Sequence, residues 1–524
     1  MNAHIIVADK GGIAMKIAII GSLLLSIWHS ILFWDSKIGI SALLFLIPAL
    51  FFVIYLLEKH GKLRNKRALF FTIPILLLAS TYCLFDNPLL YNLNFWVMLV
   101  LFACLIIGGF YPELKFKLFF SKVFNIFLGP LEFVGVAFSQ IKQCFFGPTK
   151  KEVQTGKKSI GKTIGKAILI TIPIALIVIA LLVSADDSFA RIFKVVIKTL
   201  TNWLNNINII SLVFRIAFIF IAFLYFVCFC YNLIHKDGSF EKIETIKKEK
   251  KIKLDTITMN TILTVLNLIY LVFSIMQVWA VSTHIYTDVT QYSQSARQGF
   301  FQLMIVSFIN LGLILLSTAN TKEESVKSKK YRKFMNIVMV GFTLVLLVVA
   351  FARMNFYQAN YGYTILRILV YWAIITEAIL MIPTVIYILK EKIKLFQWYV
   401  IILTVMYVGL NFINMDSMIA KKNVDRYFET GKIDLSYLQN EIGDAAIPEL
   451  KRIWNSDSNI QAKDDEWKKT HQTVNNYLYN QQTKINRKTD WQSYNVTEWI
   501  ARDTLRKMNL SYQYDQYQTD HYQL

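Results

Sequence analysis

The sequence of 524 residues has little charge and few of the patterns that mark enzymes. Only 17 % of its residues are charged, whereas 55 % are hydrophobic and 15 % aromatic. It contains no H-E-x-x-H, no G-x-S-x-G and no zinc-type spacing, and its seven histidines do not cluster. We therefore expect no catalytic set, no metal site and no cofactor.

Cysteine is also scarce. The five cysteines all precede residue 231, so the polar C-terminal part has none and no disulfide framework is available there. Cys228 and Cys230 are two residues apart and would point to different faces of a helix, which argues against a shared metal. We expect free thiols in apolar surroundings.

Long apolar runs are what the sequence has in abundance. A bilayer core requires about 20 mostly apolar residues per helix, and a backbone in lipid must satisfy its own hydrogen bonds, which favours helices over single strands. Continuous runs also differ from the alternation of a β-barrel. We predict an all-α, polytopic transmembrane helical bundle. The eleven predicted spans are 17–34, 38–57, 67–85, 93–110, 165–184, 208–233, 257–282, 299–319, 334–352, 362–389 and 395–413. The first lacks a clear cleavage site and is predicted to be retained.

Lys and Arg are distributed unevenly between the segments that join these runs. The ten residues 58–67 hold five of them, whereas 86–92 hold none, and this alternation continues along the chain. Such a bias places basic loops in the cytoplasm. It predicts a cytoplasmic N-terminus and, with eleven spans, an external C-terminal part. The net charge of +21 follows from these loops, because residues 415–524 hold 15 basic and 16 acidic residues. Nucleic acid is therefore not an expected partner.

The chain divides into five predicted parts. Residues 1–110 form four spans, 111–164 a basic cytoplasmic loop, 165–414 seven spans, 415–510 an extracytoplasmic helical domain, and 511–524 a disordered tail. Within the loop, the apolar segment 116–147 is interrupted by Gly129-Pro130. An interfacial or re-entrant helix fits it better than a span, although a span stays open as an alternative.

One motif resembles a phosphate-binding loop. The stretch "GKKSIGKT", residues 156–163, fits G-x-x-x-x-G-K-[ST]. No strand precedes it and a membrane helix is expected to follow it, so it lacks the strand–loop–helix setting that makes such a loop work. We interpret it as a lysine-rich cytoplasmic linker.

Three ionisable residues lie nearest to the predicted interior of the bilayer, namely His29, Arg215 and Glu377. Such groups are costly in a membrane unless they are paired or hydrated, so they are candidates for function. Glu377 is the sharpest, since "VYWAIITEAILMI" places it near mid-helix. It would be either a hydrogen-bonded packing residue or part of a proton or cation relay. His29 is interpreted as a packed, neutral histidine.

Polar residues recur at the predicted outer ends of the spans. If the predicted topology holds, they lie at one depth and can pair, which reduces the cost of burial. They would form either an ion-pair collar that docks the C-terminal domain or a ligand or substrate site. The candidate residues are Asp186, Asp187, Arg297, Arg353, Arg367, Asn411, Asp416 and Arg426.

The stretch "NVDRYFETGKIDLSYL", residues 423–438, directly follows the last apolar run. Thr430-Gly431 should break its helix, and Asp434 can cap the next one. Asp425 and Glu429 share a helical face with Arg426 beside them. We interpret the stretch as a rigid hinge that seats the C-terminal domain on the collar. Four tryptophans are predicted as core or membrane-surface anchors: Trp454, Trp467, Trp491 and Trp499.

Four stretches resemble a known family: "SADDSFARIF" (184–193), "YSQSARQGFFQLMIV" (292–306), "YGYTILRILVYW" (361–372) and "NVDRYFETGKIDLSYLQNEIGDAAIPEL" (423–450). In this order they are similar to the bacterial integral-membrane family known as domain of unknown function 4173, a relative of family 4153. The resemblance covers roughly 160–510. It implies a polytopic membrane protein and supplies no catalytic residue. Asp187 stands where that family often has proline.

These features predict a protein of the bacterial cytoplasmic membrane. The favoured function is non-enzymatic, namely sensing, scaffolding or assisting through the outer C-terminal domain. The first alternative is a secondary transporter that uses Glu377 and the collar. The second is an enzyme acting on lipid-linked substrates, with Asp186 or Asp187 as base or metal ligand. The expected partners are the lipid bilayer and an envelope protein or small ligand at the outer face.

Overall fold

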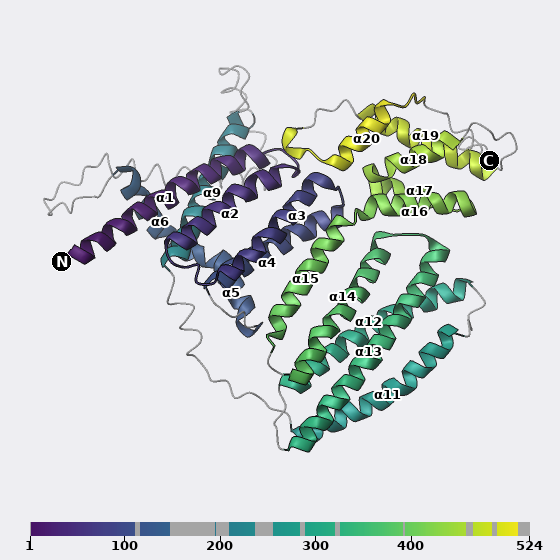
Figure 1. Cartoon of the computed structure of the whole chain (residues 1–524). Helices are drawn as coiled ribbons and strands as arrows, with labels where there is room; N and C mark the ends of the chain where they lie inside the picture. Colours follow the sequence, from purple (N-terminus) through teal and green to yellow (C-terminus); the bar gives the residue numbers. More distant parts are fainter. Residues whose placement is uncertain are drawn as a thin grey trace.

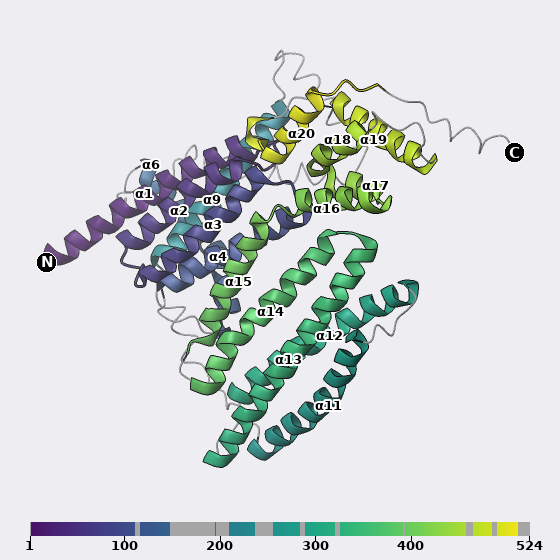
Figure 2. The same cartoon turned by 45° about the vertical axis from the view of Figure 1, so that its right-hand side comes forward.

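The computed structural model describes residues 2–110, 116–146, 209–235, 255–282, 289–319, 325–390, 393–456, 465–484 and 490–511, together with Lys194. Within these ranges every regular element is a helix and no strand occurs. The helices form two bundles joined by one helix, and a group of shorter helices covers one end of both (Figures 1 and 2).

Among the described residues, ten helical segments are long and apolar enough to cross a membrane. Nine of them coincide with predicted spans, so the prediction of an all-α, multi-span protein is confirmed. The predicted span 165–184 lies outside the described residues, and the predicted span 299–319 contains only the shorter apolar segment Gln302–Thr318. The tenth segment is Lys122–Phe145, which lies within the predicted interfacial or re-entrant segment 116–147 and keeps its alternative, a span, open.

The first bundle contains α1 (Asn2–Phe33), α2 (Ser41–Lys59), η1 (Lys66–Phe71), α3 (Thr72–Leu84), α4 (Pro88–Phe110) and α9 (Ile209–His235). Its core is built from side chains such as Leu50, Leu57, Ile75, Leu78 and Leu105. Helices α1 and α9 pack closely because α1 presents small residues to α9, as is common between membrane helices. Ser22 contacts Cys230, and Arg215 donates to Ser30 Oγ at 3.0 Å.

The segment after α4 is a broken helix. It consists of α5 (Phe116–Leu128), the 3-10 turn η2 (Gly129–Phe133) and α6 (Val134–Phe146). At 1.5 Å per residue, each helix of 13 residues is about 20 Å long, shorter than the roughly 30 Å core of a bilayer. Gly129 and Pro130 are buried where η2 packs against α9. The predicted interruption at Gly129-Pro130 is therefore present.

The second bundle contains α11 (Thr256–Ser282), α12 (Val289–Ala319), α13 (Val326–Tyr361) and α14 (Ile365–Lys390). Helix α15 (Leu395–Phe412) joins the two bundles, since it packs against α14 on one side and α3 on the other. The core of the second bundle is apolar but includes fully buried polar side chains, among them Ser307, Asn310 and Thr343.

The C-terminal helices lie across the ends of α3, α14 and α15 (Figures 1 and 2). We call this side the covered end of the bundles. The C-terminal helices are α16 (Met415–Thr430), α17 (Leu435–Tyr437), η3 (Leu438–Ile442), η4 (Gly443–Ala446), α18 (Ile447–Asn455), α19 (Asp465–Lys484), η6 (Trp491–Ser493) and α20 (Val496–Arg506).

Local sequence signals explain where α16 and its successor begin and end. Asn414 adopts a left-handed conformation with φ of 50°, which turns the chain away from α15 before α16 begins. Helix α16 ends at Thr430, and Gly431 follows with φ of 73°, a conformation in which glycine is favoured. Asp434 caps α17 by accepting from the amide of Tyr437 at 3.0 Å. The predicted break and cap are therefore confirmed.

The C-terminal helices share one apolar core with the covered end. Leu450, Val474, Leu478 and Leu505 form its centre, and Leu410 from α15 belongs to the same cluster. Trp454 and Trp467 pack against this core, as one of the two predicted roles requires. Trp491 and Trp499 instead remain 55 % and 54 % exposed, which leaves their predicted role as membrane-surface anchors open.

Candidate functional site

The covered end contains a buried network of neutral polar side chains between α3, α4 and α15. Asn94 donates to Thr81 Oγ1 at 2.9 Å and to Asn411 Oδ1 at 2.7 Å, and it accepts from the Tyr407 hydroxyl at 2.7 Å. Because buried amides are costly without partners, this network fixes the position of α15 against the first bundle. Asn411 was a predicted site residue, and the structure places it here.

Asp416 lies directly above this network at the start of α16. It is 3 % exposed, and its Oδ1 accepts from Asn87 Nδ2 at 2.7 Å. Burial raises the pKa of Asp416 to about 7, although the hydrogen bond from Asn87 acts in the opposite direction. A small cavity with room of about 20 Å³ for water centres lies beside it, lined also by Asn411 and Asn414. That volume suffices for about one water molecule.

Two further carboxyls lie at the covered end, and one of them, Asp86, is close enough to Asp416 to raise its pKa. Burial raises the pKa of Asp86, which precedes α4, while Lys37 lowers it. Burial also raises the pKa of Asp444 in η4, and Asp86 contributes in the same direction. Glu498 raises the pKa of Asp444 further, while Arg502 and Lys37 lower it. Carboxyls from the first bundle and the C-terminal helices therefore influence one another's protonation.

The C-terminal helices also grip the turn between α13 and α14. Asn423 accepts from the Tyr363 amide and donates to the Tyr363 carbonyl, both at 2.8 Å. Arg426 donates to the Asn360 carbonyl at 2.5 Å, and the Tyr437 hydroxyl accepts from the Ile365 amide at 2.8 Å. Hence one stretch, residues 423–437, supplies hydrogen-bond partners to backbone groups at the end of α13 and at the start of α14. Backbone groups at helix ends lack partners within the helix.

Gly362 lies at the centre of this turn. Its φ is 79°, and a Cβ added there would meet Asn423 Oδ1 at 2.6 Å. Arg367 donates to the carbonyls of Tyr361 and Gly362, and its guanidinium lies 4.5 Å from the centre of the Tyr357 ring. The positive φ and the close approach of Asn423 together require glycine at this position.

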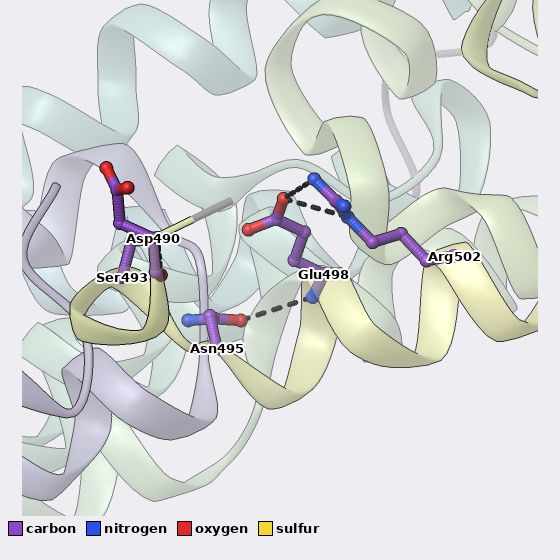
Figure 3. A network of polar contacts seen from close by, with 5 residues as sticks. All are labelled: Asp490, Ser493, Asn495, Glu498 and Arg502. Atoms are coloured by element: carbon purple, nitrogen blue, oxygen red, sulfur yellow. Dashed lines mark hydrogen bonds and ion pairs between the residues drawn. The ribbon is translucent and has the colours of Figure 1, made fainter. Parts of the chain in front are cut away.

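A third contact surface joins α20 to the first bundle. Asn495 donates to the carbonyls of Tyr82 and Phe85 at 3.0 and 2.8 Å, and Thr497 donates to the Leu84 carbonyl at 3.0 Å. Asn495 Oδ1 also caps α20 by accepting from the Glu498 amide at 3.2 Å (Figure 3). One side chain therefore starts α20 and fastens it to the end of α3.

Figure 3 also shows how the beginning of α20 is ordered. Ser493 Oγ donates to the Asp490 carbonyl at 2.7 Å, and Arg502 donates to Glu498 Oε1 at 2.6 Å through Nη2. The turn before α20 reaches the first loop of the chain, where the Ile40 amide donates to the Tyr494 carbonyl at 3.2 Å. A Cβ on Gly39 would approach the Tyr494 carbonyl oxygen to 2.6 Å, so the two backbones are in close contact.

The predicted collar residues fall into three groups. Asn411 and Asp416 lie where α15 and α16 contact the first bundle, and Arg367 and Arg426 meet at the α13–α14 turn. Arg353 lies on α13 and donates to Gln277 Oε1 of α11. Asp186 and Asp187 lie outside the described residues, as does the stretch 156–163. Arg297 belongs to α12, but the structure does not describe its side chain.

Glu377 lies inside the second bundle and is 1 % exposed. Its Oε2 accepts from Ser307 Oγ at 2.8 Å, and among the described residues none donates to its Oε1. Asn310 and Thr343 are bonded to each other at 3.0 Å three residues further along α12. Glu377 is thus held by a single hydroxyl in a mostly apolar setting. A charged carboxyl would be costly there, because one of its oxygens has no donor among the described residues.

The described residues hold no group of three or more His, Cys, Asp or Glu side chains suited to a metal ion. The hydrogen bonds at the covered end fasten the C-terminal helices to both bundles. Sequence reasoning missed the neutral members of the site, namely Asn87, Asn94, Asn423, Tyr437 and Asn495. Asparagines within otherwise apolar segments, as in "YNLNFW", were an available signal, because a buried amide requires a partner.

Comparison with known proteins adds a family but no activity. The family described as a domain of unknown function (DUF4153) matches residues 72–453, well over half of the chain. This region contains the second bundle, α15 and the stretch that grips the α13–α14 turn. No curated protein and no solved structure matches the chain. The chain thus belongs to the DUF4153 family of proteins with a domain of unknown function.

Proposed function

We propose that this protein is a non-enzymatic accessory protein of the bacterial cytoplasmic membrane, which senses or scaffolds through its C-terminal helices on the outer face. The observation that carries the proposal is that the C-terminal helices are hydrogen-bonded to both bundles. Asn495 and Asp416 connect them to the first bundle, and Asn423 and Arg426 to the second. A displacement of these helices would therefore change hydrogen bonds to both bundles at once.

The outer location is supported by charge. The connections at the covered end are poor in Lys and Arg, with Lys37 in the first and none in residues 85–87 or 362–364. The connection 60–66 at the opposite ends of α2 and α3 is basic, as cytoplasmic loops are. The exposed rings of Trp491 and Trp499, next to the end of the first bundle, suit the membrane–water interface, where tryptophan is enriched.

Reporter fusions test this topology. Fusions after residues 66, 160, 250 and 330 should report a cytoplasmic location, and a fusion after 524 an external one. A cytoplasmic signal at 524 would contradict the outer location of the C-terminal helices and would mean that a span has been miscounted.

Complementation of a deletion strain tests the role of the C-terminal helices. Arg426→Glu should abolish complementation, because it removes the bond to the Asn360 carbonyl at the α13–α14 turn. Lys468→Glu is the matched control, since its side chain is 61 % exposed and pairs only locally with Asp465. Full complementation by Arg426→Glu at normal protein levels would count against signalling through this contact.

A secondary transporter is the second candidate, and Glu377 is the observation that favours it. Intramembrane carboxyls with an unsatisfied oxygen are common in proton and ion pathways. Proteoliposomes containing the protein would show substrate-coupled proton flux, which Glu377→Gln should remove. An enzyme acting on lipid-linked substrates stays the third candidate, and its predicted residues Asp186 and Asp187 lie outside the described residues. Membership of the narrower family 4173 also stays a prediction, as does the absence of cofactor and nucleic-acid partners.

A further inference from the structure

The first bundle contains a large, partly open apolar cavity that neither the family nor the proposed function explains. Its volume is about 630 Å³, within the range of roughly 300–1,000 Å³ typical of small-molecule pockets. Its walls come from α1, α2, α3, α4, α5 and α9 and are almost entirely aliphatic or aromatic. Protein interiors are normally close-packed, so a cavity of this size in a bundle of membrane-spanning length points to an occupant.

The depth of the cavity matches one leaflet of a bilayer. Along α2 its lining runs from Ala42 near the covered end to Val53. At 1.5 Å per residue, this stretch is about 16 Å long, which is half of the roughly 30 Å hydrocarbon core. The deep end is closed by aromatic rings, since Phe102 lies 6.4 Å from Phe127 and 5.9 Å from Phe229 between ring centres. A single extended hydrocarbon chain fits this shape.

A histidine ring interrupts the mostly apolar wall. His29 lines the cavity, while its Nδ1 is covered by neighbouring protein atoms, so the remainder of the ring is what an occupant can contact. The ring is held between Phe33, Phe45 and Phe218 at centroid distances of 4.9, 5.1 and 5.3 Å. His29 lies four residues before the end of α1, or about 6 Å below it. The ester group of a lipid bound at this level would meet the His29 ring.

We propose that this cavity binds one acyl chain of a bilayer phospholipid from the leaflet at the covered end. In this arrangement the ester carbonyl of the chain accepts a hydrogen bond from the part of the His29 imidazole that lines the cavity. The aromatic rings around Phe102 set the depth that the methyl end of the chain reaches. The proposal is independent of the side on which the covered end lies.

Photolabelling of the full-length protein tests the proposal. The protein is reconstituted in vesicles of phosphatidylethanolamine and phosphatidylglycerol in which one acyl chain carries a diazirine. It is then extracted with detergent, washed to remove loosely bound lipid, and photolysed. We expect adducts on cavity residues such as Phe45, Leu46 and Leu99. A wild-type protein without adducts on these walls would overturn the proposal.

Matched variants distinguish labelling inside the cavity from labelling on the outer surface of the bundle. Ala49→Trp places a large ring in the cavity and should remove the adducts, whereas Ile47→Trp lies on the same helix at a 53 % exposed position and should not. Leu99→Trp and the 44 % exposed Val100→Trp form a second pair from α4, in case one filled variant does not fold. Undiminished adducts in a folded Ala49→Trp or Leu99→Trp protein would overturn the proposal.

Two further experiments test which lipid binds and whether its ester contacts His29. A polyprenyl phosphate with the same photoreactive group should label the cavity less than the phospholipid does, and preferential labelling by the polyprenyl chain would overturn the acyl-chain assignment. His29→Leu should lower the phospholipid retained after washing by about fivefold, as expected for one lost hydrogen bond. Unchanged retention in His29→Leu would contradict the contact with the ester.

Discussion

The C-terminal helices hold the two bundles by different chemistry. At the first bundle the contacts include the buried carboxyl of Asp416, which accepts from Asn87, and the carboxyls of Asp86 and Asp444 lie at the same end. At the second bundle Asn423, Arg426 and Tyr437 bind backbone groups of one turn. Protonation can change the first contact near neutral pH, whereas the second contains no group that titrates there. We call the contact with the first bundle the adjustable seam, because protonation can change it. The contact with the second bundle is the fixed seam.

The largest effect that would separate the two seams is a dependence of stability on pH. The pKa of Asp416 is raised to about 7 from its ordinary 3.8, so folding favours the protonated form. The resulting stabilisation is complete below about pH 4 and is lost as pH rises to about 7, with a magnitude on the order of 4 kcal/mol. Burial of Asp86 and Asp444 acts in the same direction, whereas Lys37 and Arg502 oppose it. Urea unfolding of the C-terminal helices, followed by tryptophan fluorescence between pH 4 and 8, measures this slope.

Asp416→Asn should flatten that slope, because a neutral amide can still accept from Asn87. Asp503→Asn is the control, since Asp503 lies on the surface of α20 and pairs with Lys507. An unchanged slope in Asp416→Asn would show that the first seam is as insensitive to pH as the second.

The next largest effect should come from Asn423→Leu at the fixed seam. It removes two hydrogen bonds and leaves the amide and carbonyl of Tyr363 without partners, which costs about 3 kcal/mol. Lys422→Leu is the neighbouring control at an exposed position. The loss should be the same at pH 5 and pH 8, and a strong dependence on pH would break the distinction between the seams.

Gly362→Ala should have a smaller effect at the same turn. A residue with a side chain is strained at φ of 79°, and the added Cβ would collide with Asn423 Oδ1, so about 2 kcal/mol should be lost. Gly409→Ala is the matched control, because it lies within α15 and its Cβ would meet nothing within 4 Å. Thermal unfolding in detergent should show a lower midpoint for Gly362→Ala and an unchanged or higher midpoint for Gly409→Ala.

The smallest effect should come from Glu498→Ala at the start of α20. The change removes a partly exposed ion pair with Arg502 and a favourable negative charge in the first turn, together worth about 0.5–1 kcal/mol. The loss should shrink in 1 M salt, which screens surface charges. A loss that stays constant with salt would indicate packing and not charge as its origin.

Much of the fold could be predicted from the sequence, because apolar runs of membrane length have few alternative structures. The break at Gly431 and the cap at Asp434 were equally visible, since each depends on one residue type at one position. The fastening of the C-terminal helices to the bundles was harder to foresee. Arg367 and Arg426 bind carbonyl oxygens at the end of α13. Every helix end offers such carbonyls, so no particular residue in the sequence marks them.

The neutral contacts were hidden for a similar reason. Asn94 bonds to Asn411 across 317 residues of sequence, and Asn495 bonds to carbonyls more than 400 residues before it. An asparagine in isolation suits a turn, a helix cap or a buried network alike. Its partner is determined by the packing of distant helices, which a single sequence does not reveal.

The contact between the first and last parts of the chain has a consequence for biosynthesis. Gln492 donates to the carbonyl of Ile31, 461 residues earlier, and Tyr494 reaches the loop that follows α1. At roughly 5–20 residues per second, translation leaves that loop without its partner for about 20–90 seconds. The first helical hairpin must therefore wait with the Ile31 carbonyl and the Ile40 amide without these partners, and synthesis of residues 492–494 is the event that supplies them.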